Sequence, residues 1–169
     1  PHRRGAAQRA RREPGVSGER APVLVVATVG SGLVAGAFAV FSLMVVPALT
    51  ALPGAAGATA MQSVNRTAVR PGFMTLLFGT ALVCLVLGGA ELAGSRRPAV
   101  LTGVALYLFG VVGVTVLANV PLNDALARLD AAAPGAAEEW RANAGRWTRW
   151  NTVRSLAAAG AATALVLVT

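Results

Sequence analysis

The chain has 169 residues, 55% of them hydrophobic, with a mean hydropathy of +0.62. Its apolar residues form long blocks, which excludes an ordinary water-soluble domain. The formal charge of +8 comes from arginine alone, because the sequence contains no lysine. These arginines lie in one tail and in the connections between apolar blocks, a spread that favours positively charged flanks of membrane helices over a nucleic-acid surface. We therefore expect membrane lipid, and no nucleic acid, as a partner.

Ligands for a metal or a haem are scarce in this sequence. Cys84 is the single cysteine and lies within an apolar block, while His2 is the single histidine and lies in the N-terminal tail. One cysteine excludes a disulfide within the chain, and zinc, di-iron and haem sites need more ligands than these. We expect no metal and no cofactor.

The N-terminal residues 1–21 carry six arginines and two glutamates among small and turn-forming residues. Such a segment is too polar to bury a core, so we predict a disordered tail followed by a four-span transmembrane domain over 22–169. The first apolar block, 23–46, is long enough for a retained membrane anchor. Pro47 and Pro53 are predicted to end this span, because proline interrupts the hydrogen-bond ladder of a helix.

Between Gly54 and Pro71 the sequence predicts a short amphipathic helix. Apolar residues recur on one side of it: Met61, Val64 and Ala68. Polar residues lie on the other side or at its edge: Gln62, Asn65, Arg66 and Arg70. This pattern is typical of an interfacial helix. A solvated loop, whose arginines meet lipid phosphates, is the alternative.

Three more apolar blocks follow, at 73–92, 99–118 and 153–168. The first two contain about 20 residues each, enough to cross a hydrocarbon core of roughly 30 Å. The last is shorter, and it completes a span if its helix begins near Trp147. The sequence therefore predicts an all-α, integral membrane four-helix bundle with a short interfacial helix and an extended fourth helix.

The arginines also predict an orientation for this bundle. The six in the tail lie on the same side as Arg96 and Arg97, giving eight against the seven on the other side. Because the tail holds the densest cluster and precedes the first span, we expect a multi-pass cell-membrane protein with both termini in the cytoplasm. Four spans also place the connections 47–72 and 119–152 at the same membrane face.

Most polar side chains suited to bind a ligand lie between Asn119 and Arg154. Several of them recur three or four residues apart, which puts them on one helical face: Trp140, Asn143, Trp147, Trp150 and Arg154, with Asn151 beside them. Two interpretations are open. Either Arg154 snorkels while the tryptophans join an interfacial aromatic belt, or the face lines a pocket at the mouth of the bundle.

Asn119 and Asn123 bracket Pro121 and also have two interpretations. Asn119 caps a helix that starts near Pro121, or the two amides donate hydrogen bonds to a ligand. The shared membrane face allows Asn65 and Arg66 to meet this group.

The segments NVPLN at 119–123 and WTRWNTVR at 147–154 resemble the anthrone oxygenase-like family of integral membrane proteins. AMQSVNR at 60–66 and PGF at 71–73 fit the same pattern, and the resemblance covers 23–169. It implies a four-helix membrane protein, some of whose fungal relatives oxidise anthrones to anthraquinones with molecular oxygen. Many bacterial members have no assigned reaction. The matching positions are Asn65, Asn119, Pro121, Asn123, Trp150, Asn151 and Arg154.

The resulting hypothesis is a cofactor-independent oxygenation of a hydrophobic phenolic or anthrone-type substrate. Arg154 stabilises the substrate oxyanion in this hypothesis, with Asn119 and Asn123 as hydrogen-bond donors and Asp124 as the nearest carboxylate. The expected substrate-binding residues are Trp147, Trp150, Asn151, Asn65 and Arg66.

The alternative hypothesis is a non-enzymatic scaffold or accessory subunit that packs against a partner membrane protein. It predicts that no enclosed cavity exists and that the polar face meets lipid headgroups or the partner. The sequence leaves open a homo-oligomer under either hypothesis.

Overall fold

The computed structural model describes residues 16–168 of the chain. The described residues form five helical rods and contain no strand, as the sequence predicts. Three of the rods are long and apolar enough to cross a membrane: Ala21–Thr50, Pro71–Ala93 and Pro98–Ala127. Most of the predicted disordered tail, residues 1–15, lies outside the described residues. Residues 16–21 are helical, so the first helix begins six residues before the predicted boundary at 22.

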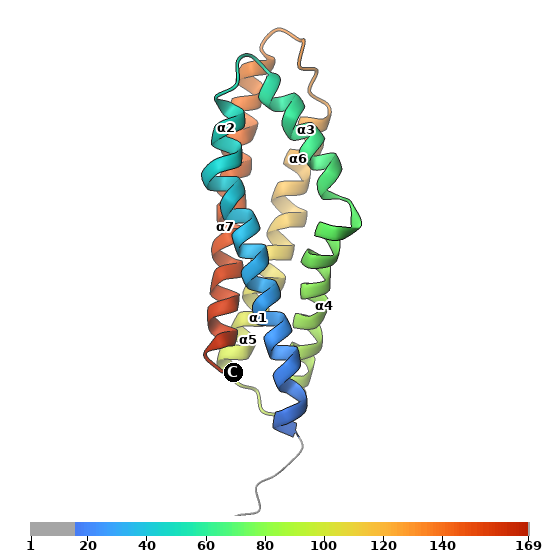
Figure 1. Ribbon diagram of the computed structural model, residues 1–169, viewed down its shortest axis with the longest axis vertical. Helices are drawn as coiled ribbons and strands as arrows, with labels where there is room; N and C mark the ends of the chain where they lie inside the picture. Colours follow the sequence, from blue (N-terminus) through green and yellow to red (C-terminus); the bar gives the residue numbers. More distant parts are fainter. Residues whose placement is uncertain (1–15, 169) are drawn as a thin grey trace, which may run out of the picture.

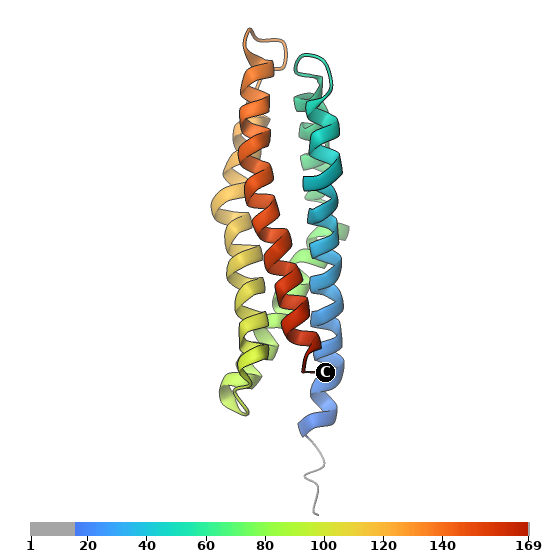
Figure 2. The same cartoon turned by 90° about the vertical axis from the view of Figure 1, so that its left-hand side faces the viewer.

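The four long rods run side by side in alternating directions (Figures 1 and 2). The first consists of α1 (Val16–Val40), η1 (Phe41–Val45) and α2 (Val46–Thr50). The second is α4 (Pro71–Ala93), and the third joins α5 (Pro98–Ala105), η2 (Leu106–Gly113), η3 (Thr115–Asn119) and α6 (Val120–Ala127). The fourth is α7 (Ala136–Val166), and the short α3 (Ala56–Ala68) lies between the first and second.

The ends of the described chain and the α4–α5 connection lie at one end of the bundle, whereas the α2–α3 and α6–α7 connections lie at the other (Figure 1). This confirms that the segments around 47–72 and 119–152 share one end. We call it the α3 end.

Pro47 does not end the first helix, contrary to the sequence-based prediction. The helix widens into π-helical turns over η1, where the N–H of Val46 donates to the carbonyl oxygen of Phe41. Pro47, which has no N–H to donate, then occupies the first turn of α2 directly after this widened segment. The rod therefore continues to Thr50, and Phe41 in the widened segment faces the interior at the α3 end.

The helices approach one another closely where small residues lie at their interface. A Cβ atom added to Gly110 in η2 would lie 2.5 Å from the Cβ of Ala157 in α7, so only glycine permits this contact. The main core lies between α1, α4, the third rod and α7, and includes Val34, Leu77, Tyr107, Val111 and Ala158. Large apolar side chains also cover the outside of the rods, as expected of surfaces that face lipid.

The predicted short helix is confirmed as α3, and the solvated-loop alternative is wrong. Met61 on its apolar side is buried against a second core that holds Leu126 and Trp140. On its other side, the Nε2 atom of Gln62 donates to the carbonyl oxygens of Leu126 at 2.8 Å and Leu129 at 3.0 Å. These contacts attach α3 to the end of the third rod, so α3 covers the interior at this end.

The extended fourth helix is also confirmed, because α7 spans 31 residues from Ala136. It packs against α1 and approaches it along its C-terminal half (Figure 2). Its N-terminal half carries exposed charged residues such as Arg141 and Arg149, and α7 is therefore not among the three long apolar helices. That α7 crosses the membrane as a fourth span stays a prediction.

Candidate functional site

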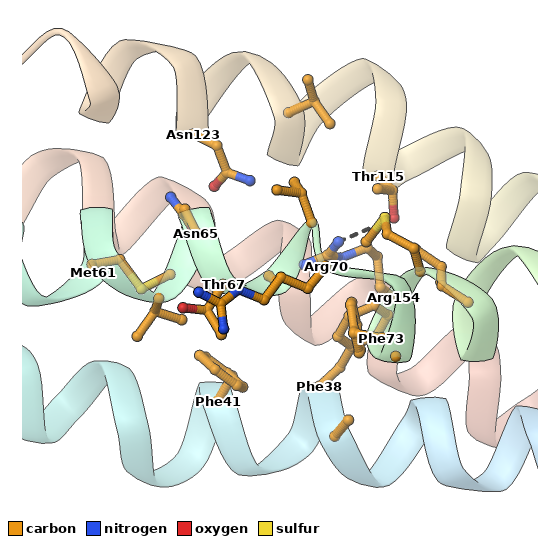
Figure 3. A pocket seen from close by; sticks show the side chains of 18 of the residues that line it. Phe38, Phe41, Met61, Asn65, Thr67, Arg70, Phe73, Thr115, Asn123 and Arg154 are labelled. Carbon is orange, nitrogen blue, oxygen red and sulfur yellow. Dashed lines mark hydrogen bonds between the residues drawn. The ribbon is translucent and has the colours of Figure 1, made fainter.

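A cavity of about 710 Å³ opens at the α3 end of the bundle, between α1, α3, α4, the third rod and α7 (Figure 3). Most of its wall is apolar and aromatic: Phe38, Phe41, Met61, Phe73, Leu77 and Trp147. Its polar side chains include Asn65, Arg70, Thr115, Asn123 and Arg154. A cavity of this size, mainly apolar with a few polar groups, is typical of a small-molecule site.

Arg154 from α7 is the most deeply buried charge in this wall, with 5% of its surface exposed. Its NH1 atom donates to the Oγ1 of Thr115 at 3.0 Å, and its NH2 atom donates to the Oδ1 of Asn151 at 2.6 Å. The guanidinium carbon also lies 4.0 Å from the ring centroid of Phe38 and 5.5 Å from that of Trp147. Arg154 does not snorkel, so the belt interpretation is wrong for this residue.

No carboxylate among residues 16–168 forms an ion pair with Arg154. Within the described part of the chain its partners are a hydroxyl, an amide and two aromatic faces, which are weaker partners than a carboxylate. A buried guanidinium in such surroundings favours an anion that enters the cavity.

Asn151 holds this arginine in place from behind the cavity wall. Its Nδ2 atom donates to the carbonyl oxygen of Phe38 at 2.7 Å and to the Oγ of Ser42 at 2.8 Å, while its Oδ1 accepts the bond from Arg154. Asn151 does not line the cavity. It therefore orients Arg154 against α1 and does not contact a ligand directly.

Asn123 presents a hydrogen-bond donor to the cavity. The Nε1 atom of Trp147 donates to the Oδ1 of Asn123 at 2.8 Å. An indole nitrogen can only donate, so this contact fixes the amide with its oxygen toward Trp147. The Nδ2 of Asn123 makes no hydrogen bond within residues 16–168 and remains able to donate to a ligand.

Asn119 plays a different part from Asn123. Its backbone is helical and its side chain caps no helix, so the capping interpretation is wrong. Its Nδ2 atom donates to the carbonyl oxygen of Trp147 at 3.3 Å, whereas its buried Oδ1 has no hydrogen-bond partner within residues 16–168. Asn119 does not line the cavity, and its contact joins the third rod to α7.

The buried face of α7 follows the predicted spacing with one change. It consists of Ala136, Trp140, Asn143, Ala144, Trp147, Asn151, Arg154, Ala158, Ala161 and Leu165. Trp150 is 46% exposed and lies outside this face and outside the cavity, so its predicted place in the stripe is wrong. Trp140 and Trp147 are buried, and the belt interpretation fails for them as well.

Of the remaining predicted residues, Asn65 lines the cavity, but Arg66 and Asp124 are exposed and do not. Most of the lining residues were not predicted as site residues, among them Phe38, Phe41, Arg70 and Thr115. Phe38 and Phe41 are three apart, a spacing that puts them on one face, but the same spacing is common within membrane spans.

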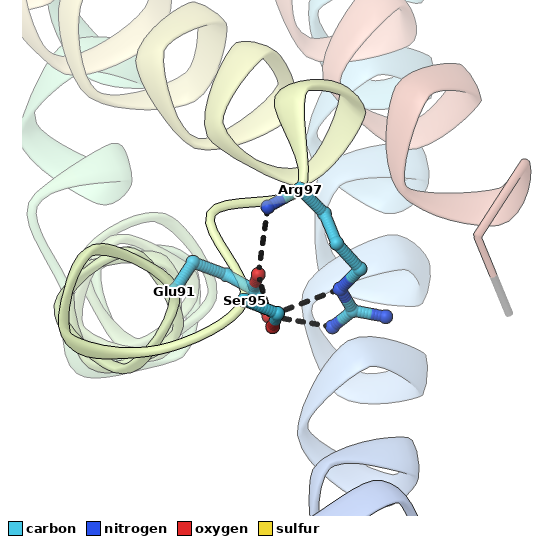
Figure 4. A network of polar contacts seen from close by, with 3 residues as sticks. All are labelled: Glu91, Ser95 and Arg97. Carbon is cyan, nitrogen blue, oxygen red and sulfur yellow. Dashed lines mark hydrogen bonds and ion pairs between the residues drawn. The ribbon is translucent and has the colours of Figure 1, made fainter.

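A separate cluster of polar side chains stabilises the turn between α4 and α5, at the opposite end of the bundle from the cavity (Figure 4). Glu91 is fully buried and accepts hydrogen bonds from the backbone N of Arg97, from its guanidinium and from the Oγ of Ser95. Hydrogen bonding to the carboxylate raises the pKa of Arg97 above its usual value. Arg96 beside it has a positive φ of 50°. This cluster holds a tight turn and lies far from the cavity.

Within residues 16–168, no three histidine, cysteine, aspartate or glutamate side chains gather as metal ligands would. No curated protein and no solved structure gives a significant match to the chain. A protein-family model described as anthrone oxygenase matches residues 61–164, more than half of the chain. The matched region contains all of α4 and of the third rod, and most of α3 and of α7. It therefore includes most of the residues that line the cavity. The chain therefore belongs to the anthrone oxygenase family.

Proposed function

We propose that this protein oxidises a hydrophobic phenolic or anthrone-type substrate with molecular oxygen and without a cofactor. The observation that carries the proposal is the guanidinium of Arg154, buried without a carboxylate partner in the wall of an aromatic cavity. Family membership is consistent with this chemistry.

The shape and lining of the cavity suit a flat polycyclic molecule. A volume of about 710 Å³ exceeds that of a three-ring aromatic, and Phe38, Phe73 and Trp147 offer ring faces and edges for stacking. Such a molecule partitions into the bilayer, so a cavity within a bundle of apolar helices can receive it from the lipid.

An anthrone carries a C–H group between two aromatic rings and opposite a carbonyl. Loss of this proton gives an anion whose charge rests largely on the carbonyl oxygen. In our proposal this oxygen binds the guanidinium of Arg154 and the Nδ2 of Asn123, two donors that prefer the anion to the neutral ketone. The site thereby lowers the pKa of the bound substrate.

The anion is electron-rich enough to reduce oxygen directly. It passes one electron to O₂, and the resulting carbon radical and superoxide combine to form a C–O bond. The peroxide anion takes up a proton, and the hydroperoxide then loses water as the C–H bond and the O–O bond break. The sum is one anthrone and one O₂ to one anthraquinone and one water.

The first proton has no acceptor in the cavity wall, because the lining residues include no carboxylate or histidine. Asp124 follows the lining residue Asn123 in the sequence, but its side chain is exposed on the surface of the bundle and does not line the cavity. We therefore assign proton removal to water at the cavity mouth, with Arg154 supplying the driving force by stabilising the anion.

The alternative of a non-enzymatic accessory subunit predicts no cavity and an outward-facing polar stripe. The cavity and the burial of Asn151 and Arg154 count against it. A partner membrane protein and a homo-oligomer stay predictions that the cavity does not address.

The test is oxygen uptake by the purified protein with an anthrone as substrate. Arg154→Met keeps an unbranched apolar stem beside Phe38 but removes the charge, and it should lower the catalysed rate about 100-fold. The matched control is Arg149→Met, since Arg149 lies on the same helix and is exposed. Circular dichroism checks that each variant is folded. Equal uptake by the wild type, the Arg154→Met variant and protein-free detergent would refute the proposal.

A further inference from the structure

The cavity wall contains a second arginine, Arg70, which the proposed oxidation does not use. It lies where α3 ends and α4 begins, on a different element from Arg154. Its guanidinium forms no hydrogen bond and no ion pair within residues 16–168. Figure 3 shows the two arginines at different places along the cavity, Arg154 beside Thr115 and Arg70 toward Thr67.

The lining residues include both cations and no carboxylate, so the cavity has a positive potential along its length. One anionic oxygen is enough for Arg154. Arg70 follows α3, on which two more polar lining residues, Ser63 and Thr67, lie, and it offers a second anionic group a point of contact separate from Arg154.

The exposed lining residues at the mouth of the cavity are partly polar and partly apolar. Ser63 and Thr67, which precede Arg70 in the sequence, are exposed, and three others are large and apolar: Val69 at 69%, Phe78 at 46% and Val120 at 41%. Arg70 itself is exposed. A molecule that fits this mouth has an apolar body and one acidic group that remains near the surface. A wholly apolar molecule would leave Arg70 without a partner.

We propose that Arg70 is a second anion-binding subsite, which selects polycyclic aromatic substrates that carry an acidic substituent, a carboxylate or an ionised phenol, away from the oxygen bound at Arg154. The identity of the ring system rests on the proposed function. Arg70 binds the substituent and takes no part in the oxidation, so it determines specificity and is not a catalytic residue.

The test compares two unreactive probes of the same shape, anthraquinone-2-carboxylate and anthraquinone-2-carboxamide. Their binding to the full chain in phosphatidylcholine nanodiscs is followed by quenching of tryptophan fluorescence, since Trp147 lines the cavity. The wild type should bind the carboxylate about tenfold more tightly than the carboxamide, the effect of one charge-assisted hydrogen bond at a partly exposed site.

Arg70→Met should abolish this preference and leave the affinity for the carboxamide unchanged. The matched control is Arg66→Met, because Arg66 lies one turn earlier on α3, is exposed and does not line the cavity. It should keep the tenfold preference. If Arg70→Met weakens both probes equally, Arg70 only shapes the cavity, and the inference is wrong; a wild type without preference refutes it as well.

An anionic lipid headgroup is the other source of an anion at this mouth. Nanodiscs of net-anionic phosphatidylglycerol are compared with those of net-neutral phosphatidylcholine, and high salt screens the repulsion of the carboxylate by the anionic surface. A headgroup that occupies Arg70 would remove the preference in phosphatidylglycerol at high salt, and that result overturns the proposal. The probes report binding without turnover. An anthrone that is not oxidised would therefore refute the proposed function and leave the preference for the carboxylate intact, while the reverse pattern would refute only the role of Arg70.

Discussion

Arg154 interacts with Phe38 in two ways: its guanidinium packs on the Phe38 ring, and Asn151 forms hydrogen bonds with both residues. The guanidinium lies 4.0 Å from the centroid of the Phe38 ring, and the asparagine that accepts its hydrogen bond at 2.6 Å donates to the carbonyl oxygen of Phe38 at 2.7 Å. The ring and the backbone of one residue in α1 therefore both set the position of the charge. The orientation of Arg154 depends on the register between α1 and α7.

Replacement of Asn151 should consequently lower the rate of oxidation without removing the charge. Asn151→Ala deletes the acceptor for Arg154 and both hydrogen bonds that Asn151 donates to the first rod, so we expect kcat to fall about tenfold as the guanidinium loses its alignment. Affinity for the neutral carboxamide probe should change little, because Asn151 does not line the cavity. Steady-state oxygen uptake and probe binding measure the two effects separately.

The control for this variant is Asn143→Ala. Asn143 is also buried on α7 and donates to the carbonyl oxygen of Leu122 at 3.1 Å, but it forms no hydrogen bond with Arg154 and does not line the cavity. It should lower thermal stability to a similar degree and leave kcat unchanged. An equal loss of kcat in both variants would mean that general loosening of α7, and not the alignment of Arg154, explains the effect.

Trp147 should act on the substrate through Asn123. Trp147→Phe keeps an aromatic ring in the wall but removes the Nε1 donor, so the amide of Asn123 loses the contact that fixes its orientation. We expect kcat/KM for an anthrone to fall about fivefold, the value of one hydrogen bond of average strength. Trp150→Phe, at an exposed position outside the cavity, is the control and should have no effect.

A double-mutant cycle tests whether the two residues act as a unit. If Trp147 works by orienting Asn123, then Trp147→Phe should add nothing to the defect of Asn123→Leu. Additive losses would show instead that the indole nitrogen affects the substrate independently of the amide.

The fold was predictable from the sequence because hydropathy alone separates the apolar blocks, and the 3.6-residue period identifies α3 and the buried face of α7. The error at Trp150 has a simple geometric cause. Trp150 lies 60° to one side of Trp147 around an ideal helix, and Asn151 lies 40° to the other, so spacing alone barely separates them. The choice depends on Phe38 of α1 and Ser42 of η1, whose oxygens accept hydrogen bonds from Asn151.

The cavity itself was only partly predictable. Arg154, Asn65 and Asn123 are conspicuous as polar groups near apolar blocks, and all three line it. Phe38 and Phe73 look like ordinary residues of a membrane span. Their part in the site follows from the π-helical turns and the packing of α3, which depend on contacts between distant segments.

The buried Glu91 predicts a stability effect at the far end of the bundle. Glu91→Gln keeps the shape of the side chain but weakens the contacts with Arg97 and Ser95, so we expect a loss of about 1–2 kcal/mol, limited because Arg97 is 34% exposed. Oxidation of an anthrone should be unchanged at temperatures where the variant is folded. Thermal unfolding in detergent measures the loss.

The exposed pair of Glu138 and Arg141 provides the comparison for this variant. Their atoms lie 3.7 Å apart and both side chains are more than half exposed, so Glu138→Gln should shift the unfolding midpoint little. Midpoints lowered equally by Glu91→Gln and Glu138→Gln would contradict the structural role of Glu91.

On the proposed function, the orientation of the bundle would determine which membrane leaflet supplies the substrate. The ends of the described chain lie together with the α4–α5 connection, which carries Arg96 and Arg97 (Figure 1), and five of the six tail arginines precede α1 in the sequence. Positive charge is retained on the cytoplasmic side, so we predict that both termini are cytoplasmic and that the α3 end faces outward. A C-terminal green fluorescent protein fusion should then fluoresce, and alkaline phosphatase inserted at Asp130, in the exposed α6–α7 connection, should be active. The opposite pair of results would reverse the assignment and place the cavity mouth, with Arg70, in the cytoplasmic leaflet, from which the substrate would then have to enter.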